Sequence, residues 1–439
     1  MDTLDSVLRA LSAHGVVRAY FKRLSPNDNT KNQIYVGGSY AALNMLPYGE
    51  VSTDSSRIGG SLGRPRFKCA LSFSWLSKTG SVSPAPAAKL ILYPDYPEVR
   101  LSGLLRGSQQ APNELLASRA PGRVLILGVT NLGTIIGFMV GADHGVARAL
   151  ASMSEDDTLL TPLPIQATAG DGRFQLLEAL RNIHAKQWID SRRLDSRGAS
   201  VPCEAENCGG YTLEAELGIT PNGYADPDFM GWEVKQFSSE NFKKPNGVLT
   251  LMTPEPDGGY YAQHGAMAFV RKFGYPDRTG RPDRLNFGGT HYVGKRTPIT
   301  GLTLQLPGYD AAGRKLVDLT GGVTLANDSG EVAASWSYAK LMEHWRRKHE
   351  RAAYLASQMK EEPRRQYRYG PTAYLGTGAN FETLLHGFAS RAIYYDPGIK
   401  IEAASTSSPR TKKRSQFRVR FGGLKALYGA FEEESLASG

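Results

Sequence analysis

One short stretch near the middle of the chain constrains the fold more than any other. Residues 232–237 have the composition of a β-strand. Because side chains alternate along a strand, Trp232 and Val234 share one face of it. Glu233 and Lys235 share the opposite face. The pattern therefore predicts a strand whose apolar face anchors it in a core and whose charged face points into an opposing cleft.

The charged face of this strand has the residues of a hydrolytic metal site. Asp228 lies just before the strand, and a tight turn at Gly231 brings it beside Glu233. Asp228 and Glu233 supply the oxygen ligands that Mg²⁺ prefers. Lys235 can orient and help to deprotonate a water that attacks a phosphate. The alternative is a surface hairpin with an ordinary Glu–Lys ion pair, worth about 0–1 kcal/mol.

Further motifs flank the strand on both sides. They are Gly209-Gly210-Tyr211-Thr212-Leu213-Glu214-Ala215-Glu216-Leu217-Gly218-Ile219, Pro221-Asn222-Gly223, Gly231-Trp232-Glu233-Val234-Lys235 and Leu249-Thr250-Leu251-Met252-Thr253-Pro254-Glu255-Pro256. Together with Asp228, they resemble the MvaI/BcnI-type restriction endonucleases of the PD-(D/E)xK nuclease superfamily. The resemblance implies an α/β (α+β) catalytic domain that cleaves duplex DNA with Mg²⁺. It places Asp228, Glu233 and Lys235 in the catalytic positions, with Asp228 and Glu233 as metal ligands.

The resemblance also assigns a role to a short helix upstream of the strand. Glu214 matches a helix-borne acid near the catalytic site in that family. Glu216 competes for the same role, because it lies in the same short segment. We therefore expect Glu214 to belong to the catalytic set, with Glu216 as the alternative.

The composition is that of a globular, multidomain protein with a basic surface. A chain of 439 residues exceeds the length at which one core keeps growing, so about two or three domains are expected. The formal net charge of +10 favours a polyanionic partner but does not require one. The three cysteines do not form a disulfide framework, which fits a reducing cytosol. With an acidic N-terminus and no long apolar run, the sequence predicts a cytoplasmic protein.

The first third of the chain is rich in short strands. Residues 16–141 alternate between strand and turn patterns, most cleanly over residues 66–76, and predict a mostly-β barrel or sandwich. Residues 21–28 and 98–108 resemble segments of the N-terminal effector-DNA-binding domain of EcoRII-type restriction enzymes. That domain is a pseudo-barrel that clamps duplex DNA, so the resemblance implies a DNA-binding or effector-binding domain here.

The same resemblance proposes individual DNA contacts in the first third of the chain. Glu98 and Arg100 fall on its base-contacting stretch, and Arg23 and Arg106 could meet phosphates. The alternative for each of the four is a solvated strand residue.

The domain boundary is predicted at residues 156–170, where acids, prolines, Thr and Gly are mixed. This linker separates a β-barrel-like domain, residues 1–155, from an MvaI-like nuclease domain, residues 171–439. Within the second domain, residues 336–362 have the pattern of one long helix that ends before Pro363.

Candidate DNA contacts also occur in the second domain. Residues 278–296 form a Gly- and Pro-rich segment in which Arg281, Arg284 and His291 suit contacts to phosphates and base edges. His264 is a further candidate base reader. The alternatives are a solvated loop face for the arginines and a structural role for the histidines.

The late part of the catalytic domain supplies much of the base recognition in MvaI-like enzymes, which implies Asp396, Arg414 and Arg418 as recognition residues. The predicted function is that of a type II restriction endonuclease, with CC(A/T)GG as the target implied by the resemblance. An N-terminal domain that binds a second DNA copy would make it type IIE. We expect a monomer that works beside a cognate DNA methyltransferase. The alternatives are a strand-specific nickase of mismatch-repair type and a non-catalytic DNA-binding protein.

Overall fold

The computed structural model of the protein describes most of the chain. The described residues are 1–26, 33–38, 40–54, 65–93, 98–118, 120–130, 132–153, 160–165, 172–220, 228–349 and 351–437. The chain divides into two compact units, Met1–Asp171 and Gly172–Gly439. The extended run predicted just before Asp228 and the Pro221-Asn222-Gly223 motif lie outside the described residues. Across the described ranges, no helix is long and apolar enough to cross a membrane.

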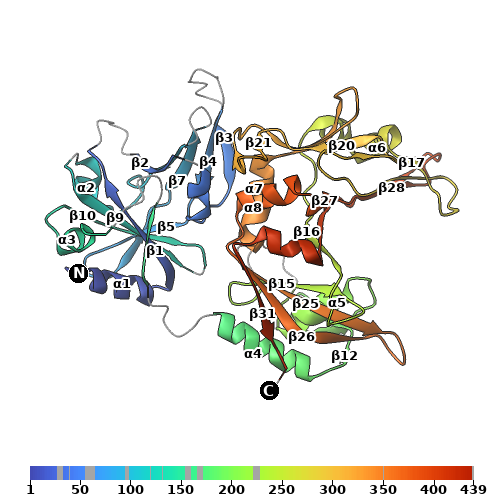
Figure 1. Ribbon diagram of the computed structural model, residues 1–439, viewed down its shortest axis with the longest axis horizontal. Coiled ribbons are helices and arrows are strands. Elements are labelled where there is room, and N and C mark those ends of the chain that lie inside the picture. Colours follow the sequence, from blue (N-terminus) through green and yellow to red (C-terminus); the bar gives the residue numbers. More distant parts are fainter. Residues whose placement is uncertain are drawn as a thin grey trace. The chain divides into compact units, whose positions relative to one another are not determined.

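The first unit consists mainly of β-strands. Its elements are α1 (Leu4–Ala13), β1 (Val16–Leu24), β2 (Ile34–Gly37), η1 (Tyr40–Asn44), β3 (Val51–Asp54), β4 (Arg66–Ala70), β5 (Phe73–Leu76), β6 (Val82–Pro84), β7 (Lys89–Tyr93), β8 (Glu98–Ser102), α2 (Asn113–Ala117), β9 (Arg123–Thr130), β10 (Ile135–Val140), α3 (Gly145–Leu150) and β11 (Thr161–Leu163). In its described part, a six-stranded sheet has the order β11-β1-β9-β10-β5-β6 and a five-stranded sheet has the order β2-β8-β7-β4-β3 (Figure 1). The mostly-β composition agrees with the sequence, and closure into a pseudo-barrel stays a prediction.

The apolar residues of the first unit explain how its larger sheet is held. Every residue of β9 and β10 is buried, so these two strands form the centre of that sheet. Helix α1 packs Val7 and Leu11 into the same core, beside Phe21 and Ile126. The sheet therefore has the continuous apolar strands expected of a fully covered layer.

Two sequence expectations for the first unit need correction. Residues 66–76 are not one strand, because β4 pairs in the five-stranded sheet and β5 in the six-stranded one. The alternate side chains from Phe67 to Trp75 are nevertheless all buried. The alternation continues through Leu71, where the chain passes from one sheet to the other. Residues 161–163, which were assigned to a linker, form β11 and pair with β1.

The second unit is built on a sheet that carries the Glu233–Lys235 strand. Its elements are α4 (Gly172–Ala185), β12 (Ile189–Asp190), β13 (Arg192–Leu194), β14 (Ser200–Pro202), α5 (Cys208–Glu216), β15 (Glu233–Ser238), β25 (Arg351–Lys360), β26 (Gln366–Thr377) and β31 (Ala430–Ser435). In the described residues this sheet has the order β12-β26-β25-β15, and β31 pairs with β26. Strand β15 runs parallel to β25, which runs antiparallel to β26.

One face of this sheet is covered by two helices. Leu176 and Leu180 of α4 and Leu213 of α5 pack against Trp232 and Val234 in one core. Figure 1 shows α4 lying alongside the sheet. The apolar face predicted for the strand at residues 232–237 is therefore the face that packs in the core.

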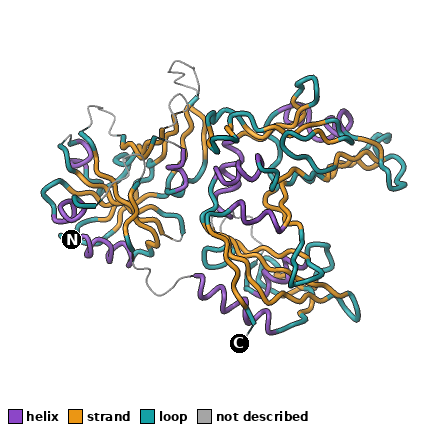
Figure 2. Tube along the Cα trace, in the orientation of Figure 1, coloured by secondary structure: helices purple, strands orange, loops and turns teal. Residues whose placement is uncertain are grey.

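The rest of the second unit is a group of smaller sheets with short helices between them. It contains β16 (Val248–Met252), α6 (Gly259–Phe273), β17 (Tyr275–Pro276), β18 (Arg284–Gly288), β19 (Arg296–Thr297), β20 (Leu302–Gln305), β21 (Tyr309–Asp310), β22 (Lys315–Leu316), β23 (Gly322–Ala326), β24 (Val332–Ser337), α7 (Tyr338–His349), α8 (Phe381–Ala389), β27 (Ile393–Tyr395), β28 (Gly398–Glu402), β29 (Arg410–Lys412), β30 (Phe417–Arg420) and η2 (Phe421–Leu427). Figure 2 shows this part of the unit as mainly strands and loops. Strands β28 and β29 extend a sheet with β17 and β18, and β30 lies between β16 and β27.

The long helix predicted for residues 336–362 is wrong. Only Tyr338–His349 is helical, and Arg351–Lys360 is strand β25. Residues 352–356 are buried without a break because β25 lies between β15 and β26. A continuous apolar run of this kind has no period that separates a central strand from a buried helix.

Candidate active site

A two-residue turn brings Asp228 to the start of the catalytic strand. Phe229 and Trp232 exchange two backbone hydrogen bonds, with N–O distances of 2.9 and 2.8 Å. Between them, Met230 has φ of 48° and Gly231 has φ of 82°. Positive φ at both central residues is the pattern of a type I′ turn, which suits the twist of a hairpin. The predicted tight turn at Gly231 is confirmed.

Asp228 is fixed to the strand by a backbone contact. Its Oδ2 accepts a hydrogen bond from the backbone N–H of Val234 at 3.0 Å. This contact spans the turn and places the carboxylate beside the first residues of β15. The second carboxylate, that of Glu233, comes from the strand itself.

Glu233 and Lys235 form a close ion pair on the face opposite Trp232. The Lys235 Nζ donates to the Glu233 Oε1 at 2.9 Å, and the two side chains are 19% and 4% exposed. Burial by itself lowers the pKa of Lys235, but the Glu233 carboxylate, with Tyr354 and Asp228, raises it above its ordinary value. An ion pair this buried is unlike the solvated surface pair that was the alternative.

The donor set fits a hard divalent cation. Magnesium is usually bound through one or two carboxylates, with water and substrate phosphates completing its shell. Asp228 and Glu233 provide two carboxylates at one strand end. No group of three or more His, Cys, Asp or Glu side chains that could hold a metal occurs within the described residues. The site therefore suits a metal that shares its coordination with substrate, and does not have the donors of a closed structural site.

Helix α5 distinguishes the two candidate acids upstream of the strand. The Glu216 side chain is 2% exposed and pairs with Arg192 at 2.6 Å and with Lys186 at 2.7 Å. Glu214 is half-buried on another side of the helix, because residues two apart on a helix differ by about 200° in direction. The ion pairs give Glu216 a structural role, so Glu214 remains the candidate for the catalytic set.

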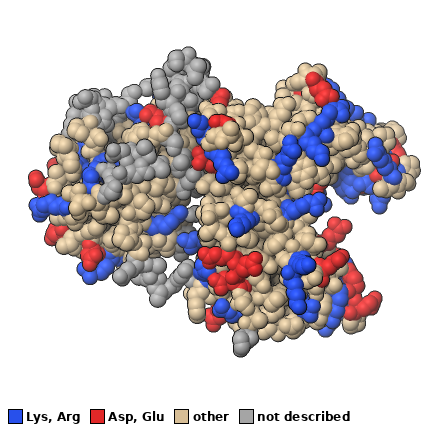
Figure 3. Space-filling view, viewed as in Figure 1, with Lys and Arg blue, Asp and Glu red and all other residues tan. Residues whose placement is uncertain are grey.

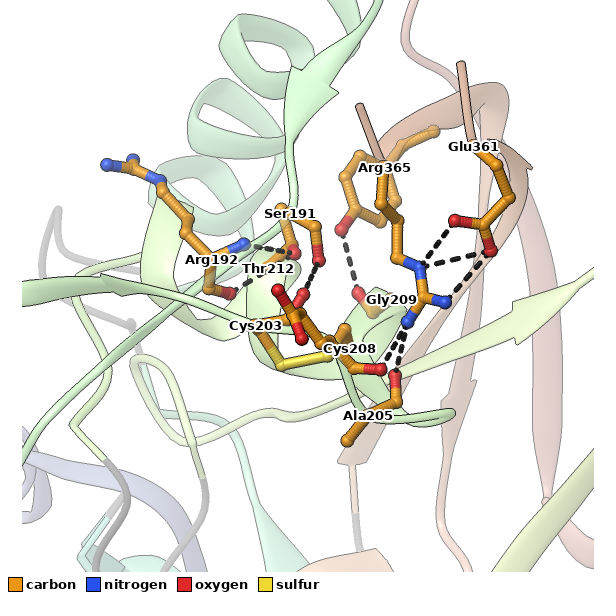
Figure 4. Close-up of a disulfide and its surroundings, with 11 residues drawn as sticks. Ser191, Arg192, Cys203, Ala205, Cys208, Gly209, Thr212, Glu361 and Arg365 are labelled. Carbon is orange, nitrogen blue, oxygen red and sulfur yellow. Dashed lines mark hydrogen bonds and ion pairs between the residues drawn. A yellow bond between two sulfur atoms is a disulfide. The ribbon is translucent and has the colours of Figure 1, made fainter. Parts of the chain in front are cut away.

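A disulfide joins Cys203 to Cys208 at the start of α5 (Figure 4). Three cysteines predict no disulfide framework, but two of them form this single bridge, with Cα atoms 5.8 Å apart. The loop between them is also held from outside, because Arg365 Nη1 donates to the carbonyls of Glu204 and Ala205 at 2.6 and 3.1 Å. Cys69 is a free, buried cysteine.

Close packing then positions α5 against the catalytic strand. A Cβ at Gly209 would lie 3.0 Å from the side chain of Gln236 on β15, so this glycine permits the close approach. The Tyr369 hydroxyl donates to the Gly209 carbonyl at 2.7 Å. Thr212 lies within the helix and is fully buried. The disulfide and these contacts fix the helix that carries Glu214.

In the first unit, one of the four predicted DNA contacts is corrected. Arg23 donates to the backbone carbonyls of Leu150, Ala151 and Met153. A cation at these carbonyls satisfies the C-terminal end of α3, so Arg23 has a structural role instead of contacting phosphate.

The other three candidates of the first unit remain at its surface. Arg100 pairs with Glu98 at 2.9 Å, with side chains that are 29% and 20% exposed. The guanidinium groups of Arg100 and Arg66 lie 5.3 and 4.9 Å from the ring centre of Tyr93. Arg106 is exposed. Their contacts with DNA stay predictions.

The histidine predictions for the second unit divide in the same way. His291 is fully buried, and its Nε2 lies 2.9 Å from the Thr300 hydroxyl. Burial lowers the pKa of His291 to about 4, so the ring is neutral near pH 7. A buried, backbone-paired histidine cannot reach a base edge, so this prediction is wrong. His264 is exposed and contacts Tyr260 in a tilted arrangement, with ring centres 4.2 Å apart.

The basic candidates of the second unit lie on the strands of its smaller sheets or in the loops between them. Arg281 is exposed, and the Arg284 Nε donates to Asn286 at 3.0 Å. Arg418 pairs with Asp396 at 2.7 Å, both about a quarter exposed, and exposed Arg414 donates to Gln416. Figure 3 shows Lys and Arg side chains gathered over the part that carries α6, β17 and β28, and Asp and Glu over β31.

Comparison with known proteins gives a family match and similar solved structures. The model of the MvaI/BcnI restriction endonuclease family matches residues 177–428, and no curated protein matches the chain. Two solved structures of restriction endonuclease MvaI are similar. The complex with cognate DNA substrate has 18% identity and a TM-score of 0.45, covering 62% of this chain and 100% of that chain. MvaI without DNA has 17% identity and a TM-score of 0.35, covering 61% and 99%. Because the family model spans more than half of the sequence, the chain belongs to the MvaI/BcnI restriction endonuclease family.

Proposed function

We propose that the protein is a type II restriction endonuclease that hydrolyses phosphodiester bonds of duplex DNA with Mg²⁺. Family membership implies a site-specific nuclease. The observation that carries the residue assignment is the strand end itself. There a hairpin turn and a hydrogen bond to Val234 N–H place Asp228 beside the Glu233–Lys235 ion pair. Its core face anchors the strand, so the polar face is held rigid for chemistry.

Asp228 and Glu233 would hold the metal ion, and Lys235 would act on the attacking water. When bound, Mg²⁺ stabilises negative charge on the phosphate and favours ionisation of water. Lys235 lies next to Glu233, where its ammonium group can orient the attacking water and stabilise the hydroxide that forms as the water's proton passes to solvent. Oxygen from the water bonds to phosphorus while the bond to the 3′ oxygen breaks, which leaves 5′-phosphate and 3′-hydroxyl ends. Glu214 on α5 would support the same site.

The basic surface of the second unit would hold the DNA. Arg281, Arg284 and Arg414 suit phosphate or base contacts, and the Asp396–Arg418 pair presents both an acceptor and donors, as reading a base pair requires. The family resemblance favours CC(A/T)GG as the target and a monomer as the active form, with a cognate methyltransferase protecting host DNA. The first unit would bind a second DNA copy through Glu98, Arg100 and Arg106.

Cleavage of supercoiled plasmid of known sequence tests this function. Purified protein is incubated with the plasmid and with either Mg²⁺ or EDTA. Discrete linear fragments that disappear with EDTA are expected, and mapping their ends gives the target. Nicked circles alone would identify a strand-specific nickase instead. DNA that is retained in a gel shift but never cut, even on a plasmid with CC(A/T)GG sites and added short duplexes, would leave a binding protein and refute the proposal.

A further inference from the structure

A buried pair of tyrosines lies beside the candidate catalytic residues. In the parallel pairing of β15 with β25, Lys235 is opposite Tyr354. Directly paired residues on adjacent strands project to the same face, so Tyr354 lies on the polar face with Glu233 and Lys235. The hydroxyl oxygens of Tyr354 and Tyr428 are 2.5 Å apart, and the two side chains are 0% and 7% exposed.

The backbone is shaped to hold the ring of Tyr428. This residue ends η2 and leads into β31. A Cβ at Gly376 of β26 would lie 2.6 Å from the ring, a distance that no side chain could accept. The ring therefore packs on bare backbone, at the position where β26 pairs Gly376 with Ala352 of β25. The absence of a side chain at Gly376 therefore specifies where the Tyr428 ring lies on this face.

The two hydroxyls are suited to serve as hydrogen-bond donors. Burial raises the pKa of Tyr354 to about 12 and raises that of Tyr428 as well, so both stay protonated near neutral pH. Two hydroxyls carry two hydrogens, and their mutual bond uses one of them. The second hydrogen can be directed at another acceptor. The Glu233 carboxylate acts electrostatically on both tyrosines, and the Lys235 ammonium acts on Tyr354.

We propose that Tyr354 and Tyr428 are positioning residues of the active site. They direct one hydroxyl hydrogen toward the Glu233 carboxylate, and they cover the polar face of the sheet beside Lys235. Loss of a buried polar group that orients a metal ligand typically costs about 10- to 100-fold in metal affinity or activity. The pair would keep Glu233 and Lys235 in one geometry when DNA arrives, without touching the DNA. This inference rests on the proposed nuclease function.

The test compares three Tyr→Phe variants of the full chain. Tyr428→Phe and Tyr354→Phe each remove one hydroxyl and keep the ring. Tyr338→Phe is the control, because its buried hydroxyl donates to the Pro307 carbonyl at 2.8 Å in another part of the unit. For each, we would measure the single-turnover rate on a duplex with the mapped site, the Kd for that duplex in EDTA, and the Tm.

The two site variants should cut about 10- to 100-fold more slowly than wild type, with Kd unchanged within about twofold. A double variant with both Tyr354→Phe and Tyr428→Phe should cut no more slowly than the slower of the two single variants. Either change alone already breaks the hydrogen bond between the two hydroxyls. Tyr338→Phe should lower Tm and leave the rate unchanged.

Two results would overturn the inference. The first is that wild type cuts and Lys235→Ala does not, while both tyrosine variants cut at the wild-type rate. The tyrosine pair would then have only a packing role, and the nuclease assignment would stand. If wild type itself does not cut under any metal condition, the proposed function fails and the inference falls with it.

Discussion

The two faces of strand β15 perform different tasks although their residues alternate along one short segment. On one face, Trp232 and Val234 are buried with the helices α4 and α5. On the other face, Glu233 and Lys235 are almost as buried, but they face each other and the Tyr354 side of the sheet. In the proposed nuclease, burial serves stability on one face and electrostatic pre-organisation on the other.

Removing the carboxylates of the polar face should produce the largest effect. Glu233→Gln and Asp228→Asn keep the side-chain shape but remove a ligand charge, so we expect single-turnover cleavage to fall by about 10³- to 10⁴-fold, or roughly 4–5.5 kcal/mol in activation free energy. The rate is measured with enzyme in excess over a duplex that carries the mapped site. A loss smaller than about tenfold in both variants would show that the metal is held elsewhere.

The core face should respond in stability instead. Trp232 is 2% exposed in the core, so Trp232→Ala should lower the free energy of unfolding by about 3–5 kcal/mol, measured by urea denaturation. Phe174→Ala on α4 is the matched control, since this ring is 68% exposed and its loss should cost about 0.5 kcal/mol or less. Equal effects of the two changes would contradict the assignment of the core face.

The two acids of α5 extend the comparison between structural and catalytic roles to a helix. Glu216→Gln breaks ion pairs with Arg192 and Lys186, both partly exposed, so it should lower stability by about 1–2 kcal/mol. Glu214→Gln should leave the urea midpoint near that of wild type and slow cleavage about tenfold. If Glu216→Gln slows cleavage more than Glu214→Gln at equal folded fraction, the two roles are exchanged.

The disulfide should have the smallest effect on cleavage. It closes a short loop between Cys203 and Cys208 that Arg365 also holds, so Cys203→Ser with Cys208→Ser should lower the free energy of unfolding by about 2 kcal/mol or less. Cleavage by the folded variant should match that of wild type, measured with and without dithiothreitol. A rate that responds to the reductant in wild type but not in the double variant would give the disulfide a role in catalysis.

Local patterns predicted strand β15, its core face and the turn before it correctly because their physical causes are local. The two-residue period separates Trp232 from Glu233, and Gly231 supplies the positive φ that the turn needs. The type of each residue and its neighbours along the chain were sufficient. The family resemblance adds Glu214, on the separate helix α5, and its role stays a prediction.

The features that the sequence did not predict depend on tertiary contacts. Tyr354 was assigned to a helix, because a central strand buried on both faces has no alternation to reveal it. His291 resembles a base reader in a polar loop, and only the packing of Tyr395 and Thr300 around it shows that it is buried. Arg23 is basic on a strand, and only the folded unit brings it to the end of α3.

The most direct test of the polar face is the comparison of binding and cleavage in Lys235→Ala. Its Kd for duplex with the mapped site is measured in EDTA, and its single-turnover rate is measured with Mg²⁺. We predict a Kd within about threefold of wild type and a rate at least about 10²-fold lower, since Lys235 acts on the water and not on DNA binding. A variant that binds normally and cuts at the wild-type rate would contradict the assignment of β15 as the catalytic strand.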